Sequence, residues 1–475
     1  MNSPTDVNVQ AVLLPGFVGP TLPDWLEARL RDGLAGVCLF ATNIRSRGQL
    51  RELTDAIRAA NPLALIAIDE EGGDVTRLYS DSGSPFPGNA LLGRIDDAGL
   101  TREVAVRVGR ELLSVGVNLN FAPDVDINSN PDNPVIGTRS FGTDAELVAK
   151  HTAAWVEGLQ STATAASVKH FPGHGDTATD SHLALPVVDR SLKQLRKREL
   201  VPFAAAIEAG TKTVMTSHIL VPQLDDQNPA TLSRVVLREL LRDEMGFKGV
   251  IVTDALDMKG ASGATGIPVA AVRALAAGAD LLCIGTENTD AELGRIEAAI
   301  LAAIADGTLK AKRVAKAVER NHQLAHELLE LAASTDVSGV EEPDFPLERA
   351  IAAFDIKPDA TVPAGARIVT IETTANIAVG GSPWGLGAAG IDVTPVSPGD
   401  TPPHGGPLVI VGKDNHRHAY SRELIDAARA EHPTTLVVDM GWPSDDRRYA
   451  DVATFGASRY VGQALAAWLQ EAENK

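Results

Sequence analysis

Residues 249–254 read Gly-Val-Ile-Val-Thr-Asp, a short β-branched run that ends in a carboxylate. Such a run is typical of a strand buried in a parallel sheet. Similar runs lie elsewhere in the first two-thirds of the chain, at Val9–Leu14, Gly36–Phe40, Leu63–Asp69, Val117–Pro123, Ala166–His170, Thr213–His218 and Asp280–Ile284. Helical patterns separate the runs; in residues 146–160, for example, the apolar side chains recur along one face.

Repeated strand–helix units predict a parallel sheet, and eight strands favour a closed TIM (β/α)8 barrel. The catalytic residues of such a barrel lie at the carboxyl ends of its strands. Polar side chains follow four of the predicted strands, namely Asp69, Lys169 with His170, Ser217 with His218, and Asp254. The fold class predicted from the sequence is therefore α/β, with the chemistry at one end of the barrel.

An acidic, proline-containing stretch follows Leu331 and is typical of a link between domains. Beyond it, strand-like and helical runs predict a smaller open α/β sheet, at Arg367–Ile371, Leu408–Val411, Thr435–Val438, Ser421–Ala430 and Tyr460–Gln470. We therefore expect a catalytic barrel domain in residues 1–335, a linker in 336–362 and a second domain in 363–475.

Composition narrows the possible partners and location. The 475 residues include 43 basic and 62 acidic side chains, a net charge of −19, which disfavours nucleic acid and anionic membranes as partners. The first ten residues carry no apolar leader, and no long uncharged apolar stretch occurs. Cys38 and Cys283 lie in strand-like runs, where we expect small buried thiols and no disulfide. The expectation is a soluble cytoplasmic protein.

The densest chemistry lies in residues 169–182, Lys-His-Phe-Pro-Gly-His-Gly-Asp-Thr-Ala-Thr-Asp-Ser-His. Proline and glycine exclude a helix there and allow unusual backbone angles, so we interpret the segment as a reactive loop. His170 and His174 have the spacing of a helical metal pair, but Pro172 and Gly173 between them forbid the helix. We expect no metal, and assign His174 to shaping the loop.

A second motif looks like a cofactor site. Residues 385–390, Gly-Leu-Gly-Ala-Ala-Gly, match the dinucleotide fingerprint, but a strand-like run follows where the motif requires a helix. We expect a flexible loop there, and no cofactor.

The chain resembles the N-acetyl-β-glucosaminidase branch of glycoside hydrolase family 3, which includes the bacterial β-hexosaminidases of cell-wall recycling. The blocks that carry the resemblance are 36–40 (GVCLF), 68–73 (IDEEGG), 120–123 (NFAP), 135–142 (VIGTRSFG), 169–177 (KHFPGHGDT), 180–182 (DSH) and 252–258 (VTDALDM). The resemblance implies a barrel followed by the smaller α/β sandwich domain of the longer members.

Retaining cleavage of a glycosidic bond needs a carboxylate nucleophile and a proton donor. Asp254 matches the nucleophile of the family; a cap for the next helix is the alternative. Imidazole titrates near neutrality, so His182 can protonate the leaving oxygen and later activate the acceptor. Asp180 would fix the tautomer of His182 and raise its basicity, as the Asp–His dyad of this branch does. Two ordinary polar loop residues are the alternative for the dyad.

Lys169 and His170 end a buried strand and are expected to bind sugar hydroxyls. By resemblance, Asp69 and Arg139 join them around the non-reducing sugar, although a cap and a structural ion pair respectively would also explain these two residues. The chain departs from the common family pattern at Glu70 and Asp74, where glutamine or histidine and arginine are usual.

Three functions stay open at this point. The first is a retaining exo-hydrolase that releases terminal N-acetyl-β-D-glucosamine, from either a peptidoglycan-derived disaccharide or a chitin fragment. The second is an N-acetylglucosamine β-glycoside phosphorylase, since a neutral histidine does not repel incoming phosphate as a carboxylate would. The third is a non-catalytic sugar-binding protein. A β-glucosidase is disfavoured, because that branch takes its acid from the second domain and lacks the loop from Pro-Gly-His-Gly to Asp-x-His, residues 172–182 here.

Overall fold

The computed structural model describes residues 7–177, 185–263, 265–336, 343–373, 376–401 and 404–473. This part of the chain forms two compact units, and both are discontinuous in sequence. The first unit comprises Met1–Glu70, Ala98–Ile127 and Asp144–Glu341, and the second comprises Glu71–Asp97, Asn128–Thr143 and Glu342–Lys475. Two segments that precede residue 335 thus pack with the second unit, whereas the division predicted from the sequence treats each domain as one continuous stretch.

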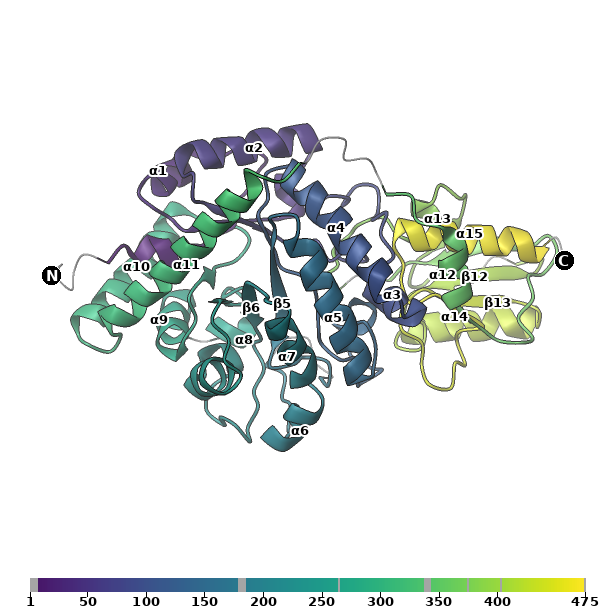
Figure 1. Cartoon of the computed structure of the whole chain (residues 1–475). Coiled ribbons are helices and arrows are strands. Elements are labelled where there is room, and N and C mark those ends of the chain that lie inside the picture. Colours follow the sequence, from purple (N-terminus) through teal and green to yellow (C-terminus); the bar gives the residue numbers. More distant parts are fainter. Residues whose placement is uncertain are drawn as a thin grey trace. The chain divides into compact units, whose positions relative to one another are not determined.

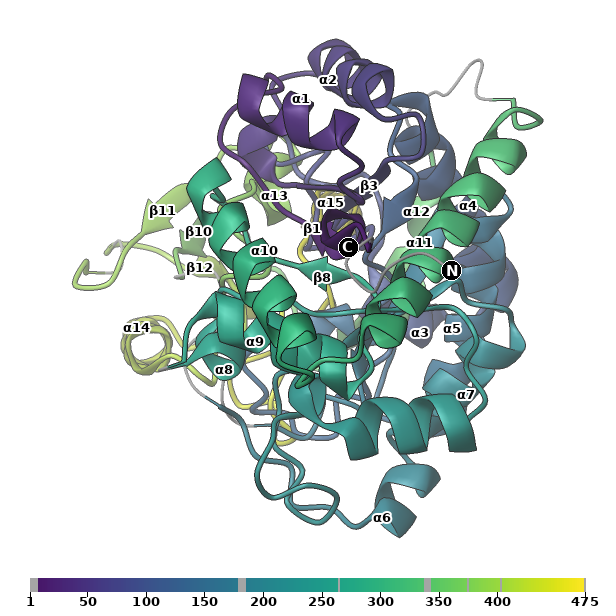
Figure 2. The same ribbon diagram turned by 90° about the vertical axis from the view of Figure 1, so that its left-hand side faces the viewer.

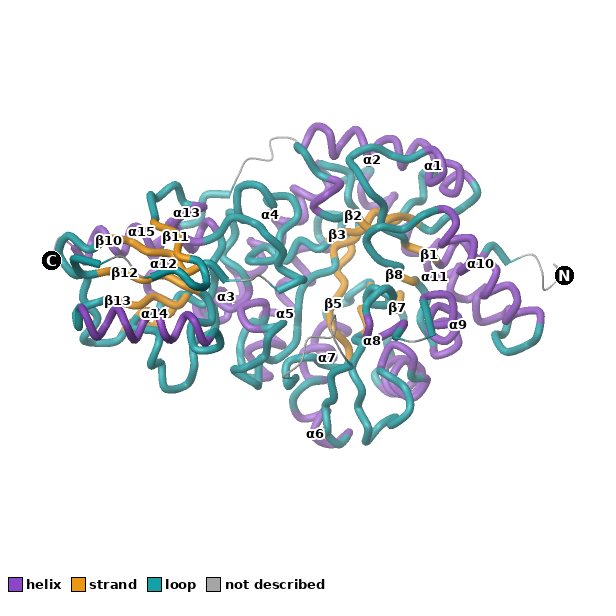
Figure 3. The backbone as a smooth tube through the Cα atoms, turned by 180° about the vertical axis from the view of Figure 1, so that it is seen from behind, coloured by secondary structure: helices purple, strands orange, loops and turns teal. Residues whose placement is uncertain are grey.

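The first unit is built on parallel strands. They are β1 (Leu13–Leu14), β2 (Gly36–Leu39), β3 (Leu65–Ile68), β4 (Leu119–Asn120), β5 (Ala165–Phe171), β6 (Thr213–Thr216), β7 (Val250–Val252) and β8 (Leu282–Cys283). Within the described residues β2 to β7 form one six-stranded sheet in chain order, and β1 pairs with β8. The sheet is curled, with its strands enclosed by helices (Figure 3).

Helices cover the outside of this sheet (Figure 2). They are α1 (Asp24–Arg31), α2 (Arg47–Ala60), α4 (Ala98–Ser114), α5 (Ala145–Gln160), α6 (Leu192–Lys197), α7 (Leu200–Glu208), α8 (Lys259–Ser262), α9 (Ile267–Ala277), α10 (Asp290–Ala305) and α11 (Ala311–Ala332). Short turns η1 (Val9–Val12), η2 (Ala41–Asn43) and η4 (Ala230–Leu232) and the π-helix η5 (Val235–Glu244) complete the unit. Helix α5 begins where the Asp144 carboxylate accepts the Leu147 N–H at 2.9 Å, a side-chain N-cap.

The core inside the curled sheet is apolar, and it includes both cysteines. Cys38 on β2 and Cys283 on β8 are 1% and 3% exposed and form no disulfide, as predicted. One predicted strand is wrong in part: residues 9–12 form a single 3-10 turn, because the Asn8 side chain accepts the Gln10 N–H and closes the chain into a turn before β1.

The second unit contains a six-stranded sheet among its described residues, in the order β11-β10-β12-β13-β14-β9. The strands are β9 (Asp355–Ile356), β10 (Arg367–Ile371), β11 (Thr394–Val396), β12 (Leu408–Gly412), β13 (Leu436–Asp439) and β14 (Val452–Ala453). All pair in parallel except β9, which is antiparallel to β14. The predicted strands at Arg367, Leu408 and Thr435 are confirmed within one residue at either end.

Helices lie on both faces of this second sheet, with α14 on one face and α15 on the other (Figure 1). The helices of the unit are α3 (Asn89–Ile95), η3 (Gly137–Arg139), α12 (Leu347–Ala353), α13 (Gly385–Ala388), α14 (Ala419–Glu431) and α15 (Arg459–Glu473). The prediction of a flexible loop at residues 385–390 is wrong, because Gly385–Ala388 forms a helical turn that packs on α15. A side chain at Gly462 would come within 2.0 Å of the Gly385 carbonyl, so close packing explains glycine there.

Among the described residues, none of the helices combines the length and the apolar character that a membrane span requires.

Candidate active site

A buried ion pair lies at the carboxyl ends of β3 and β5. The Lys169 Nζ is 2.6 Å from the Asp69 Oδ1, and the two side chains are 3% and 19% exposed. An ammonium removed from water needs a partner, and Asp69 provides it. The structure thus brings together two residues that the sequence predicts to bind sugar, and it leaves the Asp69 carboxylate partly open to solvent.

His170, the next residue of β5, is fixed by a carboxylate that the sequence analysis did not single out. Its Nδ1 lies 2.7 Å from the Asp126 Oδ2, and its backbone N–H donates to the same oxygen. Asp126 and its neighbour Asp124 are 1% and 0% exposed. The two acids follow β4 in the run Asn120-Phe-Ala-Pro-Asp-Val-Asp, and their position at a strand end is the signal that could have identified them.

Asp124, Asp126 and His170 offer ligand atoms that all lie within 4.8 Å of one another. The geometry admits a cation, but these groups already bind protein donors. Asp124 accepts the Asp126 N–H at 2.9 Å, and Asp126 accepts the His174 N–H at 2.6 Å. The cluster therefore has a sufficient structural explanation, which is to orient the His170 ring and the loop that follows it.

Asp254 occupies the carboxyl end of β7, directly after Thr253. Its side chain is half-buried, and one carboxylate oxygen accepts the Ala255 N–H at 2.8 Å. The strand before it is buried throughout, so the carboxylate lies where the apolar strand meets the end of the sheet. This placement agrees with the position predicted from the sequence.

His218 supports the backbone beside Asp254. The ring is fully buried after β6, and its Nε2 donates to the Ala255 carbonyl at 2.9 Å. Its Nδ1 lies 2.8 Å from the Thr231 hydroxyl. His218 is one of the polar residues that the sequence places at a strand end, and these contacts assign it a supporting role.

The loop after β5 leaves the strand in a shape that requires glycine. Gly173 has φ of +129°, and a side chain at Gly175 would come within 1.7 Å of the Ile127 carbonyl. Asp176 then pairs with Arg190 at 2.7 Å and Arg198 at 2.8 Å. The predicted dyad, Asp180 and His182, lies outside the described residues.

Arg139 belongs to the second unit. Its guanidinium makes a two-pronged ion pair with Glu71, with Nε–Oε2 at 2.9 Å and Nη2–Oε1 at 2.8 Å, and both side chains are almost fully buried. Asp74, which departs from the usual family residue, also lies in this unit. The structural ion pair considered as the alternative for Arg139 is therefore present, and its role toward sugar stays a prediction.

Comparison with known proteins identifies the relatives of this chain. The model of the glycosyl hydrolase family 3 N terminal domain matches residues 24–324. Beta-hexosaminidase A of Pseudoalteromonas piscicida is 36% identical over 374 residues, and the match covers 72% of this chain and 62% of that protein. Beta-hexosaminidase of Stenotrophomonas maltophilia (strain K279a) is 39% identical over 284 residues, covering 58% and 83% of the two chains.

A solved structure is similar over nearly the whole chain. The glycoside hydrolase family 3 beta-N-acetylglucosaminidase from Paenibacillus sp. str. FPU-7 superposes with a TM-score of 0.87 at 31% identity. The superposition covers 99% of this chain and 97% of that one, so it includes both compact units.

Proposed function

Because the chain belongs to glycoside hydrolase family 3, we propose that it is a retaining, exo-acting β-N-acetylglucosaminidase that releases terminal non-reducing N-acetyl-β-D-glucosamine. The observation that carries the proposal is the grouping of Asp254, Lys169 and Asp69 at the carboxyl ends of three parallel strands of one unit. The relatives named beta-hexosaminidase and beta-N-acetylglucosaminidase support the choice of sugar.

In the proposed reaction, the Asp254 carboxylate attacks the anomeric carbon as the glycosidic bond breaks, and a covalent glycosyl-aspartate forms. His182 gives its proton to the leaving oxygen in this step. Water then attacks the anomeric carbon, His182 takes the proton of that water, and the bond to Asp254 breaks. The anomeric configuration is inverted twice and therefore retained. Asp180 orients the His182 ring and raises its basicity.

Sugar recognition is assigned to Asp69, Lys169, His170 and Arg139. A carboxylate accepts two hydroxyl protons, and an ammonium and a guanidinium donate in return. The buried environment of Lys169 supports this role, because fixed charges in a site that excludes water are aimed without reorganisation. No cofactor enters any step of the proposed reaction.

We propose further that the strands of the first unit close into a (β/α)8 barrel. Hydrogen bonds at the two remaining seams support closure: the Cys38 N–H donates to the Pro15 carbonyl at 2.9 Å, and Val252 bridges to Leu281 in parallel. We assign the second unit to the α/β sandwich type of the longer family members, and we place the enzyme in the cytoplasm, with a peptidoglycan or chitin fragment as its substrate.

Product analysis with 4-nitrophenyl N-acetyl-β-glucosaminide tests the proposal, with the matching glucoside as the control substrate. We expect free N-acetylglucosamine at a rate that phosphate does not change. A dominant sugar 1-phosphate in the presence of phosphate would instead assign the phosphorylase, with the same residues in the same roles. Absence of turnover on the acetamido sugar would overturn the proposal.

A further inference from the structure

The second unit contains a polar cavity of about 90 Å³ outside the carboxyl ends of its parallel strands. Thr373 follows β10, Lys413 follows β12 and Gly441 follows β13, and all three line the cavity. From β10 the chain passes to β11 on one side and then to β12 on the other, so strand order reverses at this point. In open α/β sheets ligands bind at such a switch point.

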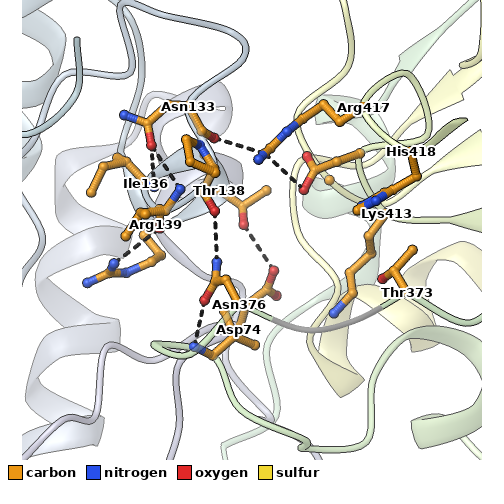
Figure 4. Close-up of a pocket in the computed structure, with 16 residues that line it drawn as sticks. Asp74, Asn133, Ile136, Thr138, Arg139, Thr373, Asn376, Lys413, Arg417 and His418 are labelled. Atoms are coloured by element: carbon orange, nitrogen blue, oxygen red, sulfur yellow. Dashed lines mark hydrogen bonds and ion pairs between the residues drawn. The ribbon is translucent and has the colours of Figure 1, made fainter. Parts of the chain in front are cut away.

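The loop after β12, residues 413–418, lines one side of the cavity and is held in place by Asp439. Asp439, at the end of β13, accepts the Asp414 N–H at 2.8 Å, the Asn415 N–H at 3.0 Å and the Gly441 N–H at 2.8 Å. A side chain at Gly441 would come within 2.5 Å of the Asp414 backbone. The loop is therefore fixed by buried hydrogen bonds and close packing, and its side chains project into the cavity (Figure 4).

The two carboxylates of the cavity already bind protein donors. Asp74 accepts the Ala457 N–H at 2.9 Å with one oxygen and the Thr138 hydroxyl at 3.0 Å with the other. Asp414 accepts the Trp442 N–H at 2.9 Å, and its second oxygen lies 3.5 Å from Arg417. The acceptors that the protein supplies are thus largely satisfied from within the unit.

The Lys413 and Arg417 side chains, by contrast, leave hydrogen-bond donors in the cavity without an acceptor among the described residues. The Lys413 Nζ lies 4.5 Å above the Trp384 ring, and within the described residues it makes no hydrogen bond or ion pair. Arg417 uses Nη1 to donate to the Asn133 carbonyl at 2.8 Å, and among the described residues its Nε and Nη2 groups have no acceptor. A ligand that completes this cavity must therefore bring acceptor oxygens.

We propose that this cavity binds a small carboxylate, with Lys413 as its main charged partner and Arg417 beside it. Arg139, which also lines the cavity, is paired with Glu71. The positive charges of Lys413 and Arg417 are balanced by Asp74 and Asp414, so a monoanion leaves one negative charge in excess and a phosphate dianion leaves two. A cavity of about 90 Å³ has room for a carboxylate group and a short attached chain.

The test measures acetate binding to the full-length protein by saturation-transfer NMR at constant ionic strength. Lys413→Met keeps the stem over Trp384 and removes the charge, so we expect acetate binding to weaken about tenfold or more. Arg367→Met is the matched control, because it removes an exposed charge from the amino end of β10, the opposite end of the same strand. It should bind acetate as the wild type does.

A second measurement needs no variant. Burial lowers the pKa of Lys413, against the charges of Asp74 and Asp414, which raise it. The ammonium should therefore lose its proton below the ordinary lysine value of 10.5, and acetate binding should fall as the pH rises toward that value. Unchanged binding across that range would contradict the role of Lys413.

The remaining outcomes are also decisive. Absence of saturable acetate binding, or binding that Lys413→Met leaves unchanged, would overturn the proposal. Inorganic phosphate that binds through Lys413 more tightly than acetate would overturn the assignment to a carboxylate. The proposal does not depend on the glycosidase reaction, since binding is measured without substrate turnover.

Discussion

Lys169 and Asp69 show at the scale of single residues why a charged site can exist at the end of an apolar sheet. Polar side chains are placed at or near the carboxyl ends of β3 and β5, so the energetic cost of desolvation is confined to groups that pair with each other. Asp126, which follows β4, and His170, the next residue of β5, repeat this arrangement. Chain position alone predicts such placements once the strands are recognised.

Some pairings could not be read from the sequence. The partner of Arg139 is Glu71, a residue 68 positions away, and nothing in either local pattern identifies it. Likewise, Asp126 lies 44 positions from His170. Strand ends can be located from hydrophobic runs, but which of their side chains meet depends on packing between distant segments.

The proposed acid–base role of His182 gives a kinetic prediction. Replacement by alanine (His182→Ala) should slow hydrolysis of a natural disaccharide far more than that of a 4-nitrophenyl glycoside, because a good leaving group needs little protonation. Steady-state kcat/KM on both substrates measures the difference. Equal losses on the two substrates would remove His182 from the acid role.

At the scale of elements, the start of β8 is held by one buried carboxylate among three arginines. Asp280 is fully buried and pairs with Arg242 of η5, with Arg313 at 2.7 Å and with Arg320 at 3.0 Å. The two last arginines belong to α11, so the cluster joins one strand to two helices. Burial lowers the pKa of Arg242 to about 10, which still leaves it charged at neutral pH.

Asp280→Asn should therefore destabilise the protein by about 3–5 kcal/mol, because it leaves buried guanidinium groups without their counter-charge. Asp290→Asn removes a 60% exposed carboxylate that pairs with Arg29, and should cost at most about 1 kcal/mol. Urea unfolding of the two variants measures the contrast. Similar midpoints for both would show that the cluster does not stabilise the first unit.

Asp439 makes the second sheet sensitive to pH. Burial and the nearby charge of Asp414 raise its pKa to about 7, against an ordinary value of 3.8. The folded state therefore binds the proton more tightly than the unfolded state, and this contribution to stability is lost as the pH rises from about 4 through 7.

The stability advantage of the wild type over Asp439→Asn should accordingly shrink between pH 5.5 and pH 8. Titrating groups such as His416 and His418 are present in both proteins, so their contributions cancel in the difference. Asp446→Asn, a change at an exposed carboxylate, is the control and should show no such trend. Thermal unfolding at pH 5.5 and pH 8 measures the difference in stability between the wild type and each variant. A difference for Asp439→Asn that is the same at both pH values would contradict the raised pKa.

Elements of both units were largely predictable. Long amphipathic or β-branched runs such as α5 and β10 appear where their patterns place them, because burial of one face or of a whole strand dictates the residue types. The turn at residues 9–12 and the helix at Gly385 could not be predicted from such patterns. The Asn8 cap decides the turn, and the close contact between Gly385 and Gly462 decides the helix.

At the scale of the whole molecule, the two compact units share the chain in an interleaved way. Residues 71–97 pack with the later part of the second unit: Phe86 contacts Phe345 with ring centroids 6.3 Å apart, and the Arg94 Nε donates to the Ala353 carbonyl at 2.8 Å. Such segments cannot be assigned from linear sequence, because they lie between predicted barrel strands while their packing partners come much later in the chain.

A chain of residues 1–335, cut at the boundary predicted from the sequence, should accordingly be insoluble or unfold at a markedly lower temperature than the full chain. The cut separates residues 71–97 and 128–143 from the rest of their compact unit, and Ala90 loses its apolar cluster with Ala450, Ala453 and Phe455. Soluble expression and thermal unfolding of the two chains test this. A soluble short chain with the unfolding temperature of the full chain would show that these segments do not depend on the second unit.

The most direct test of the proposed mechanism is to trap the covalent intermediate. A fluorinated N-acetylglucosaminyl fluoride forms the glycosyl-enzyme faster than water removes it, so the intact mass should rise by one sugar residue. Peptide mapping should then place the sugar on Asp254, and Asp254→Asn should stay unlabelled. A sugar attached elsewhere, or equal labelling of Asp254→Asn, would contradict Asp254 as the nucleophile proposed for this chain.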